Sequence, residues 1–303
     1  MKNYINAKQK AIRHLRVEKK YDHPVTIKIG PTDLCNFDCP HCSEDKTGGR
    51  SHPDLIKLIE IVAPYCKAIV FSGNGEPTMH PDFLIAVGYA KNYHKLEVGL
   101  ITNGSLIKDE EIDRYRRLCT WIRISIDATD PETYAKVHGI SPEVFWRVLQ
   151  TGNRLQGGNA TIGGGFLIPK DVMGNSWFVK AKILTKDFDY TQFRNFHGDT
   201  TDYTDNVGHM GLYKKPSSEP LPKHCYAGEF TKVIEPNGDV VWCCHTRGLE
   251  RFTVGNVYED PECLKKTLEV DTSKCPLTCI HRNMNSTLEG LIEPEPMDHE
   301  NFI

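Results

Sequence analysis

The residues with the clearest chemical potential are three closely spaced cysteines near the start of the chain. Cys35, Cys39 and Cys42 follow the pattern C-x3-C-x2-C within GPTDLCNFDCPHCSED. Three thiolates on a loop that curls back on itself can hold three corners of a 4Fe-4S cluster, which keeps one iron open for an outside ligand. The alternative is a structural zinc site with a fourth ligand such as His41 or His52. The spacing alone leaves both metals open.

A second group of cysteines lies toward the C-terminus. Its members are Cys225, Cys243, Cys244, Cys275 and Cys279. The chain has eleven cysteines and no export signal, so the thiols indicate metal binding rather than a disulfide framework. Four of them could form another iron–sulfur centre or a structural zinc site with four cysteine ligands.

The elements that must position these cysteines alternate over the first two thirds of the chain. Apolar or alternating runs predict six strands, which begin near Val25, Ala68, Glu97, Trp121, Ala160 and Tyr190. Helical patterns lie between them, at 54–62, 82–93, 108–118, 143–155 and 176–184. Such alternation predicts a parallel sheet with right-handed crossovers. Six units are too few to close an eight-stranded barrel, so we expect an α/β fold, a partial (β/α)6 TIM-like barrel that stays open.

The rest of the chain predicts a smaller unit. The stretch 201–221, rich in Gly, Pro, Ser and Asp, predicts a linker. Asn237-Gly238 between two β-rich runs predicts a hairpin, and a short helix is expected near 262–268. The predicted division is a helical extension at 1–21, the barrel at 22–200, the linker at 201–221 and a small domain at 222–303, built from a β-hairpin and short helices.

Polar motifs follow the second, third and fourth predicted strands. They are Gly73-Asn74-Gly75-Glu76, Thr102-Asn103-Gly104 and Ser125-Ile126-Asp127. Each motif on its own is typical of a turn between a strand and a helix. Together they fall, with the cysteine loop and the glycine-rich fifth strand, at the carboxyl edge of the sheet, where β/α barrels carry their active sites.

This arrangement resembles the radical S-adenosylmethionine (SAM) superfamily over residues 22–200. The resemblance implies a 4Fe-4S cluster on Cys35, Cys39 and Cys42, with His41 where an aromatic residue usually precedes the third cysteine. The SAM-contacting residues that it implies are His41, Gly73, Asn74, Gly75, Glu76, Thr102, Asn103, Ser125 and Asp127. Asn74 departs from the usual Gly-Gly-Glu, a change that we expect to be tolerated because backbone makes most of this contact.

The chemistry implied by this resemblance belongs to the cofactors. SAM would chelate the open iron. An electron from an external reductant of the flavodoxin or ferredoxin type would cleave the S–C5′ bond and give a 5′-deoxyadenosyl radical. That radical would abstract a hydrogen atom from an unactivated C–H bond of the substrate.

The second group of cysteines resembles the auxiliary-cluster extension of the same superfamily, in the short twitch form of the SPASM type. The implied ligands of an auxiliary 4Fe-4S cluster are Cys225, Cys243, Cys275 and Cys279. The choice of Cys243 over Cys244 depends only on the spacing from Gly238. Relatives of this type oxidise alcohols on small molecules, epimerise such centres or modify peptides. The resemblance therefore favours an oxidoreductase whose auxiliary cluster accepts the second electron.

The substrate is less determined. The short segment 1–21 leaves little room for a leader-binding domain, which favours a small polar molecule such as a sugar, an aminocyclitol or a nucleotide over a peptide. Candidate residues at the barrel mouth are Lys170, Asp171, His197 and Asp199, with Cys244 as the candidate non-ligand thiol. Cys66, Cys119 and Cys263 are expected to be buried apolar residues. The competing hypotheses are an epimerase, a peptide-modifying enzyme and, from another class, a non-catalytic protein with two structural metal sites.

Composition excludes several classes of protein. The chain has 37 Lys and Arg against 40 Asp and Glu, a net charge of −3, so a nucleic-acid partner is not indicated. No apolar run reaches the length of a membrane span, and the N-terminus lacks the apolar core of a signal peptide. These features predict a soluble, cytoplasmic enzyme.

Overall fold

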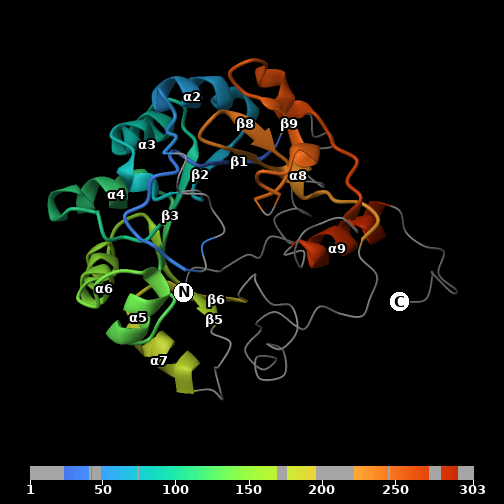
Figure 1. Cartoon of the computed structure of the whole chain (residues 1–303). Helices are drawn as coiled ribbons and strands as arrows, with labels where there is room; N and C mark the ends of the chain where they lie inside the picture. Colours follow the sequence, from blue (N-terminus) through green and yellow to red (C-terminus); the bar gives the residue numbers. More distant parts are fainter. Residues whose placement is uncertain are drawn as a thin grey trace, which may run out of the picture.

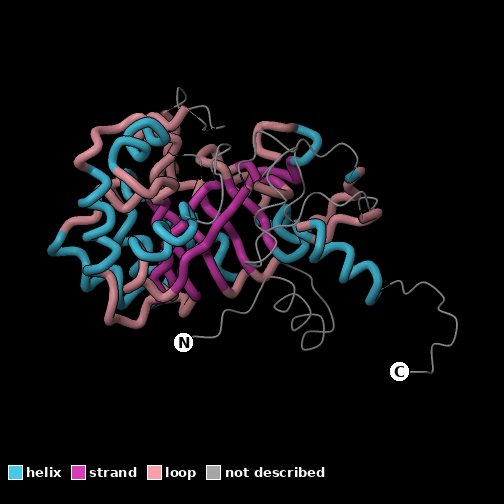
Figure 2. The backbone as a smooth tube through the Cα atoms, turned by 90° about the horizontal axis from the view of Figure 1, so that it is seen from below, coloured by secondary structure: helices cyan, strands magenta, loops and turns pink. Residues whose placement is uncertain are grey.

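Nine strands form a single sheet in the part of the chain that the structure describes. The computed structural model describes residues 24–40, 42, 49–73, 75–168, 176–195, 222–244, 246–272 and 281–292. The strand order is β6-β5-β4-β3-β2-β1-β7-β8-β9. Figure 1 shows the strands in their sequence colours, and Figure 2 shows them in magenta. The strands are β1 (Thr26–Ile29), β2 (Ala68–Phe71), β3 (Glu97–Thr102), β4 (Trp121–Ser125), β5 (Thr161–Ile168), β6 (Tyr190–Asn195), β7 (Thr231–Ile234), β8 (Asp239–Val241) and β9 (Thr253–Asn256).

Helices separate the first six strands, and Figure 1 shows them on the outer side of the sheet. They are α2 (Leu55–Val62), α3 (Phe83–Asn92), α4 (Ile112–Leu118), α5 (Pro131–His138), α6 (Val144–Arg154) and α7 (Ser176–Leu184). Two more, α8 (Ala227–Phe230) and α9 (Arg282–Ile292), lie near the other end of the sheet (Figure 1). A short 3-10 helix at Pro261–Lys265 replaces the longer helix expected near 262–268.

The six predicted parallel strands are confirmed. Each of β1 to β6 pairs in parallel with its sequence neighbour, and the sheet stays open, as a partial barrel does. The prediction missed α5, although its boundaries carry local signals. Asp130 caps the helix by accepting a hydrogen bond from the backbone of Thr133 at 2.8 Å, Pro131 occupies the first turn, and Gly139 ends the helix with φ +59°.

The sheet continues beyond the barrel strands. β7 pairs in parallel with β1, from Thr26↔Thr231 to Ile29↔Ile234, and β8 and β9 follow as antiparallel strands. The hairpin predicted at Asn237-Gly238 is confirmed, since this turn joins β7 to β8 and Gly238 takes φ +90°. The strands after residue 222 therefore add to the edge of the barrel at β1.

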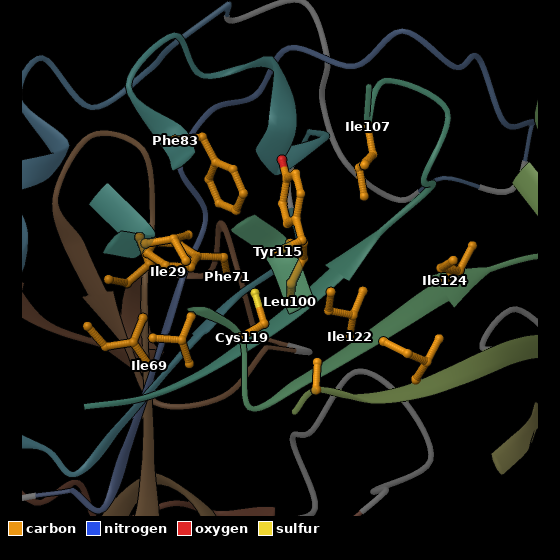
Figure 3. Packing of buried hydrophobic residues seen from close by; sticks show 14 of the residues in the cluster. Ile29, Ile69, Phe71, Phe83, Leu100, Ile107, Tyr115, Cys119, Ile122 and Ile124 are labelled. Carbon is orange, nitrogen blue, oxygen red and sulfur yellow. The ribbon is translucent and has the colours of Figure 1, made fainter. Parts of the chain in front are cut away.

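The register divides the sheet residues between two faces, because neighbouring residues in register share a face. The outer face carries apolar side chains that pack against the helices, including Ile29, Ile69, Phe71, Leu100, Ile122 and Ile124 (Figure 3). Phe83 of α3 packs edge-on to Phe71, with ring centroids 5.2 Å apart, and stacks on Tyr115 of α4. Each such buried side chain contributes about 1.5–3 kcal/mol to folding, so this core fixes the positions of the strand ends.

The opposite, inner face is lined differently. Its positions include Lys28, Val70, Gly99, Arg123, Ser125, Gly163, Gly165, Tyr190, Gln192 and Arg194. Most of its side chains are only half-buried, and several are polar or charged. No helix in the described part of the chain is both long enough and apolar enough to cross a membrane.

Candidate functional site

The base of the cysteine loop is closed by polar contacts directly after β1. Arg50 Nε pairs with Asp33 Oδ2 at 2.6 Å, and the Asp33 backbone donates to the Arg50 carbonyl at 2.7 Å. Thr32 forms an antiparallel bridge to Ser51, whose hydroxyl donates to the Thr32 hydroxyl. Residues 34–49, which include Cys35, Cys39 and Cys42, therefore leave and rejoin the sheet at one point.

The loop after β2 lies directly on the cysteine loop. The backbone N–H groups of Gly75 and Glu76 donate to the carbonyls of Thr32 and Leu34, both at 2.8 Å. A Cβ atom at Gly75 would overlap the Leu34 carbonyl. Glycine is required here because the two backbones touch, and the contact fixes the residue next to Cys35.

Glu76 joins the loops after β2 and β3. Its carboxylate is buried and accepts hydrogen bonds from the Thr102 hydroxyl at 2.6 Å and the Asn103 N–H at 2.8 Å. It also accepts from the Thr78 hydroxyl and N–H, at 2.7 and 3.1 Å. Burial raises the pKa of this carboxyl group, and these donors oppose the rise. The structure thus gives Glu76 a positioning role, and its contact with SAM stays a prediction.

The loop after β3 also binds the cysteine loop. Asn103 Nδ2 donates to Asn36 Oδ1, and Asn36 Nδ2 donates to the Ser105 hydroxyl, both at 2.9 Å. Asn103 Oδ1 accepts from the backbone N–H of Ser105 at 2.9 Å. Asn36 directly follows Cys35, so the predicted Thr102-Asn103-Gly104 motif is one of the supports of the cysteine loop.

Asp127 and α5 complete the support from the side of β4. Asp127 takes φ +57°, and its Oδ1 accepts from the backbone N–H of Leu167 at 2.6 Å. His138, at the end of α5, is buried, with Nδ1 3.2 Å from Cys39 Sγ and Nε2 3.1 Å from the Ile126 carbonyl. Its own carbonyl accepts from the Asp38 N–H at 3.0 Å. Sequence reasoning missed His138 because it missed α5.

The donor set of the cysteine loop fits an iron–sulfur cluster. Cys35, Cys39 and Cys42 are half-buried. No three His, Cys, Asp or Glu side chains in the described ranges converge on a single-ion site. In a 4Fe-4S cluster each thiolate binds a different iron, so the three thiols need not converge on a point. His52, a possible fourth zinc ligand, is buried and bonded through Nδ1 to the Tyr258 hydroxyl at 2.8 Å.

The C-terminal cysteines separate into two environments. Cys225 is buried in a small apolar cluster, and Cys243 packs against the same cluster. Cys244 instead faces Lys28 of β1, with 3.8 Å between Nζ and Sγ. This thiol therefore lies beside the inner face of the sheet, a position that the sequence did not predict. The expected buried thiols are confirmed, and burial raises the pKa of Cys66 and Cys119 to about 12 and that of Cys263 to about 11.

An ion pair from the C-terminal hairpin reaches the predicted SAM loop. Glu235, directly after β7, pairs with Arg247 Nε at 2.9 Å, and both side chains are nearly buried. A Cβ atom at Gly73 would overlap the Arg247 guanidinium, so this group lies against the loop after β2. Sequence reasoning missed both residues. The sequence did place Glu235 at the end of a strand. That position could have indicated a site residue only if the parallel pairing of β7 with β1 had been known.

Several predicted site residues fall outside the described part of the chain. They are His41, Asn74, Lys170, Asp171, His197, Asp199, Cys275 and Cys279. Among the others, the structure brings Gly73, Gly75, Glu76, Thr102 and Asn103 to the carboxyl edge beside the cysteine loop. Ser125 ends β4 on the inner face, in register with Gly165.

Comparison with known proteins gives relatives for part of the chain. The probable GTP 3',8-cyclase of Methanosarcina mazei is 29% identical over 141 residues, which are 43% of this chain and 41% of that protein. The GTP 3',8-cyclase of Photorhabdus laumondii is 24% identical over 131 residues, 41% of this chain and 39% of that protein. The chain thus matches less than half the length of these curated relatives.

Solved structures share the fold over more of the chain. Streptococcus suis SuiB, solved bound to S-adenosylmethionine, has a TM-score of 0.62 at 16% identity, covering 90% of this chain and 73% of SuiB. Native anSMEcpe with bound AdoMet has a TM-score of 0.60 at 18% identity, covering 80% of this chain and 81% of that chain. At these identities the likeness concerns the fold.

A domain match covers the strands that carry the strand-end motifs. Residues 29–172 match the domain model of the radical SAM superfamily. This range contains the cysteine loop and all three strand-end motifs. The partial barrel brings those motifs to one edge of the sheet, against the cysteine loop. Over residues 29–172 the chain therefore resembles the radical SAM superfamily.

Proposed function

We propose that this protein reductively cleaves SAM and uses the resulting radical to take a hydrogen atom from a small polar substrate, which it then oxidises. One observation carries the proposal. The loops after β2 and β3 and helix α5 all contact the loop of Cys35, Cys39 and Cys42, through Gly75, Asn103 and His138. Such mutual support is what a site needs to hold a cluster and a cofactor in one fixed geometry.

The residues of the chain would bind the cluster, orient the loops around it and shield the site from water. Cys35, Cys39 and Cys42 would hold a 4Fe-4S cluster, which supplies the electron for SAM cleavage when bound. Gly75 and Glu76 keep the loop after β2 against the cysteine loop, and Asp127 fixes the strand end beside Leu167. The outer-face core below these loops excludes water from one side of the site.

The test of this proposal is SAM cleavage by the reconstituted protein. With a strong reductant, the wild type should convert SAM to 5′-deoxyadenosine, whereas the variant C35A/C39A/C42A should not. C66A is the matched control, because Cys66 is a buried thiol far from the loop in sequence, and it should retain cleavage. Full cleavage by the triple variant would overturn the assignment.

We further propose an auxiliary 4Fe-4S cluster on Cys225, Cys243, Cys275 and Cys279. The shared environment of Cys225 and Cys243, apart from Cys244, supports the choice of Cys243 as the ligand. Such a cluster supplies a one-electron acceptor, which suits an oxidation. The reconstituted wild type should hold about eight irons and C35A/C39A/C42A about four. A triple variant that contains zinc and no iron would show that the C-terminal site is structural.

For the substrate, the partial match to GTP 3',8-cyclases supports a nucleotide among the small polar molecules. Solved structures of SuiB with a precursor peptide and of anSMEcpe with a peptide keep a peptide substrate as the alternative. An external one-electron reductant of the flavodoxin or ferredoxin type is the proposed protein partner.

A second outcome, epimerisation, is favoured by one contact. Cys244 lies beside Lys28 at the inner face, where a thiol could return a hydrogen atom to the product. The two outcomes differ in product mass in deuterated water. Oxidation gives a product two mass units lighter than the substrate, whereas thiol quenching adds one deuterium, because a thiol hydrogen exchanges with solvent. If quenching occurs, C244A should lose the deuterated product.

A further inference from the structure

Two arginines stand on the inner face of the barrel, on either side of a glycine-containing strand. Arg123 of β4 is in register with Gly163 of β5, which is in register with Tyr190 of β6. Arg194, also of β6, is in register with Leu167 of β5. The residues between these positions, such as Ile122, Ile124, Phe166 and Phe193, belong to the core on the outer face. The two arginines therefore face the same space, away from the helices.

The glycines of β5 leave room for side chains that cross this strand. A Cβ atom at Gly163 would overlap the ring of Tyr190, and one at Gly165 would lie 3.3 Å from Cδ of Arg123. Arg123 reaches over Gly165, and its Nη1 donates to Gln192 Oε1 at 2.5 Å. Gln192 is in register with Gly165 and Ser125. The Arg123 guanidinium is therefore held at the level of Ser125, one of the predicted SAM contacts.

The charge of the inner face differs from that of the whole chain. The chain has a net charge of −3, yet the barrel strands present Lys28, Arg123 and Arg194 on this face. The acidic residue at an inner-face position of these strands is Glu97, which begins β3 at the far, amino end of the sheet. A cationic surface of this kind attracts anions to the site.

Arg194 adds a hydrogen-bond donor on the same face. Its Nε is a buried donor without a hydrogen-bond partner among the described residues. Buried donors are nearly always satisfied in folded proteins, by protein, water or ligand. A guanidinium presents a planar fork of donors that matches a carboxylate or a phosphate.

We propose that Arg123 and Arg194 bind an oxyanion of the substrate, a carboxylate or a phosphate, and so orient the substrate below the SAM site. This inference rests on the proposed function, since it names the substrate class of the same site. Gln192 fixes the Arg123 guanidinium, and Gly165 keeps open the space that this side chain crosses. Arg194 binds the same anion from the strand on the other side of β5.

The experiment measures anion binding by calorimetry to the full-length, cluster-reconstituted protein with SAM present. The probes are inorganic pyrophosphate for the phosphate class and malonate for the carboxylate class. The tighter probe identifies the class, and R123Q/R194Q should weaken its binding at least tenfold, because each arginine contributes charged hydrogen bonds. The matched control is R114Q/R117Q, which removes the same charge from exposed positions on α4.

A second measurement uses the wild type and so does not depend on the folding of a variant. Phenylglyoxal should modify Arg123 and Arg194 more slowly when the tighter probe is bound, as mapped by mass spectrometry. Equal binding by wild type and R123Q/R194Q, no protection, or a loss of SAM affinity in R123Q/R194Q would each overturn the proposal. Uncoupled SAM cleavage is measured on the wild type. Its absence from the wild type would refute the proposed function while leaving the anion measurement valid.

Discussion

At the scale of single residues, the site depends on a glycine that lets two backbones touch. Gly75 lies against the Leu34 carbonyl, and the next residue along that loop is Cys35. Gly75→Ala should push the cysteine loop away from its position and lower the iron content from about eight atoms toward about four, since the C-terminal ligands are unaffected. The strain should also lower the free energy of unfolding by about 1–3 kcal/mol.

Iron analysis and urea unfolding check this prediction, and Gly88→Ala is the control. Gly88 lies within α3, where the nearest atom to an added Cβ is 3.7 Å away. Alanine in a helix is favoured over glycine by about 0.5–1 kcal/mol, so this variant should be at least as stable as the wild type and keep its iron. Full iron content in Gly75→Ala would contradict the role assigned to the backbone contact.

At the scale of elements, α5 acts as a support for the cysteine loop. Gly139 ends the helix with φ +59°, and a Cβ atom there would overlap the Asp38 carbonyl. Gly139→Ala should therefore destabilise the chain and also speed loss of the cluster, because α5 can no longer dock against the residue next to Cys39. The measurement is the decay of visible absorbance during mild chelation.

Gly157→Ala separates this docking from backbone strain. Gly157 has φ +80°, but a Cβ atom there would meet nothing within 4 Å. The Gly157→Ala variant should lose only the cost of an alanine in the left-handed conformation, about 1–2 kcal/mol of the free energy of unfolding. Its cluster lifetime should equal that of the wild type. Equal lifetimes in the two variants would mean that α5 does not support the loop.

At the scale of the whole molecule, His52 links the start of α2 to the segment after β9. Its Nδ1 is 2.8 Å from the Tyr258 hydroxyl. Burial, with the neighbouring His80, lowers the pKa of His52 from 6.5 to about 4. As the pH falls, His52 binds a proton in the unfolded chain before it does so in the folded protein. The contribution of neutral His52 to the free energy of unfolding is therefore complete above pH 6.5 and is lost toward about pH 4.

Urea unfolding between about pH 7 and about pH 5 should show this loss, with a slope from His52 of up to about 1.4 kcal/mol per pH unit. His52→Gln should flatten the dependence, because glutamine does not titrate. Tyr258→Phe should lower stability at neutral pH yet keep the slope, since burial is the main cause of the shift. An unchanged slope in His52→Gln would assign the acid sensitivity to other groups.

Much of the architecture followed from local patterns. The strand and helix periods, the Asn237-Gly238 turn and the C-x3-C-x2-C spacing predicted the parallel sheet, the hairpin and the family. Helix α5 was missed although its cap residues, Asp130 and Gly139, are visible in the sequence, so local signals could have predicted it. The expected helix at 262–268 shortened to a 3-10 helix, Pro261–Lys265.

The sequence by itself determined the spacing of the three thiols and the edge of the sheet at which their loop lies, because periodicity and spacing act over short stretches of chain. Only the tertiary structure decided which distant residues meet there. Arg247 lies on Gly73 because β7 pairs with β1, and Arg123 crosses Gly165 to reach Gln192 because three strands hold one register. The hydrophobic alternation of each strand selects which of its faces is buried, but which strands pair and which residues stand opposite one another is settled only when distant strands pack together.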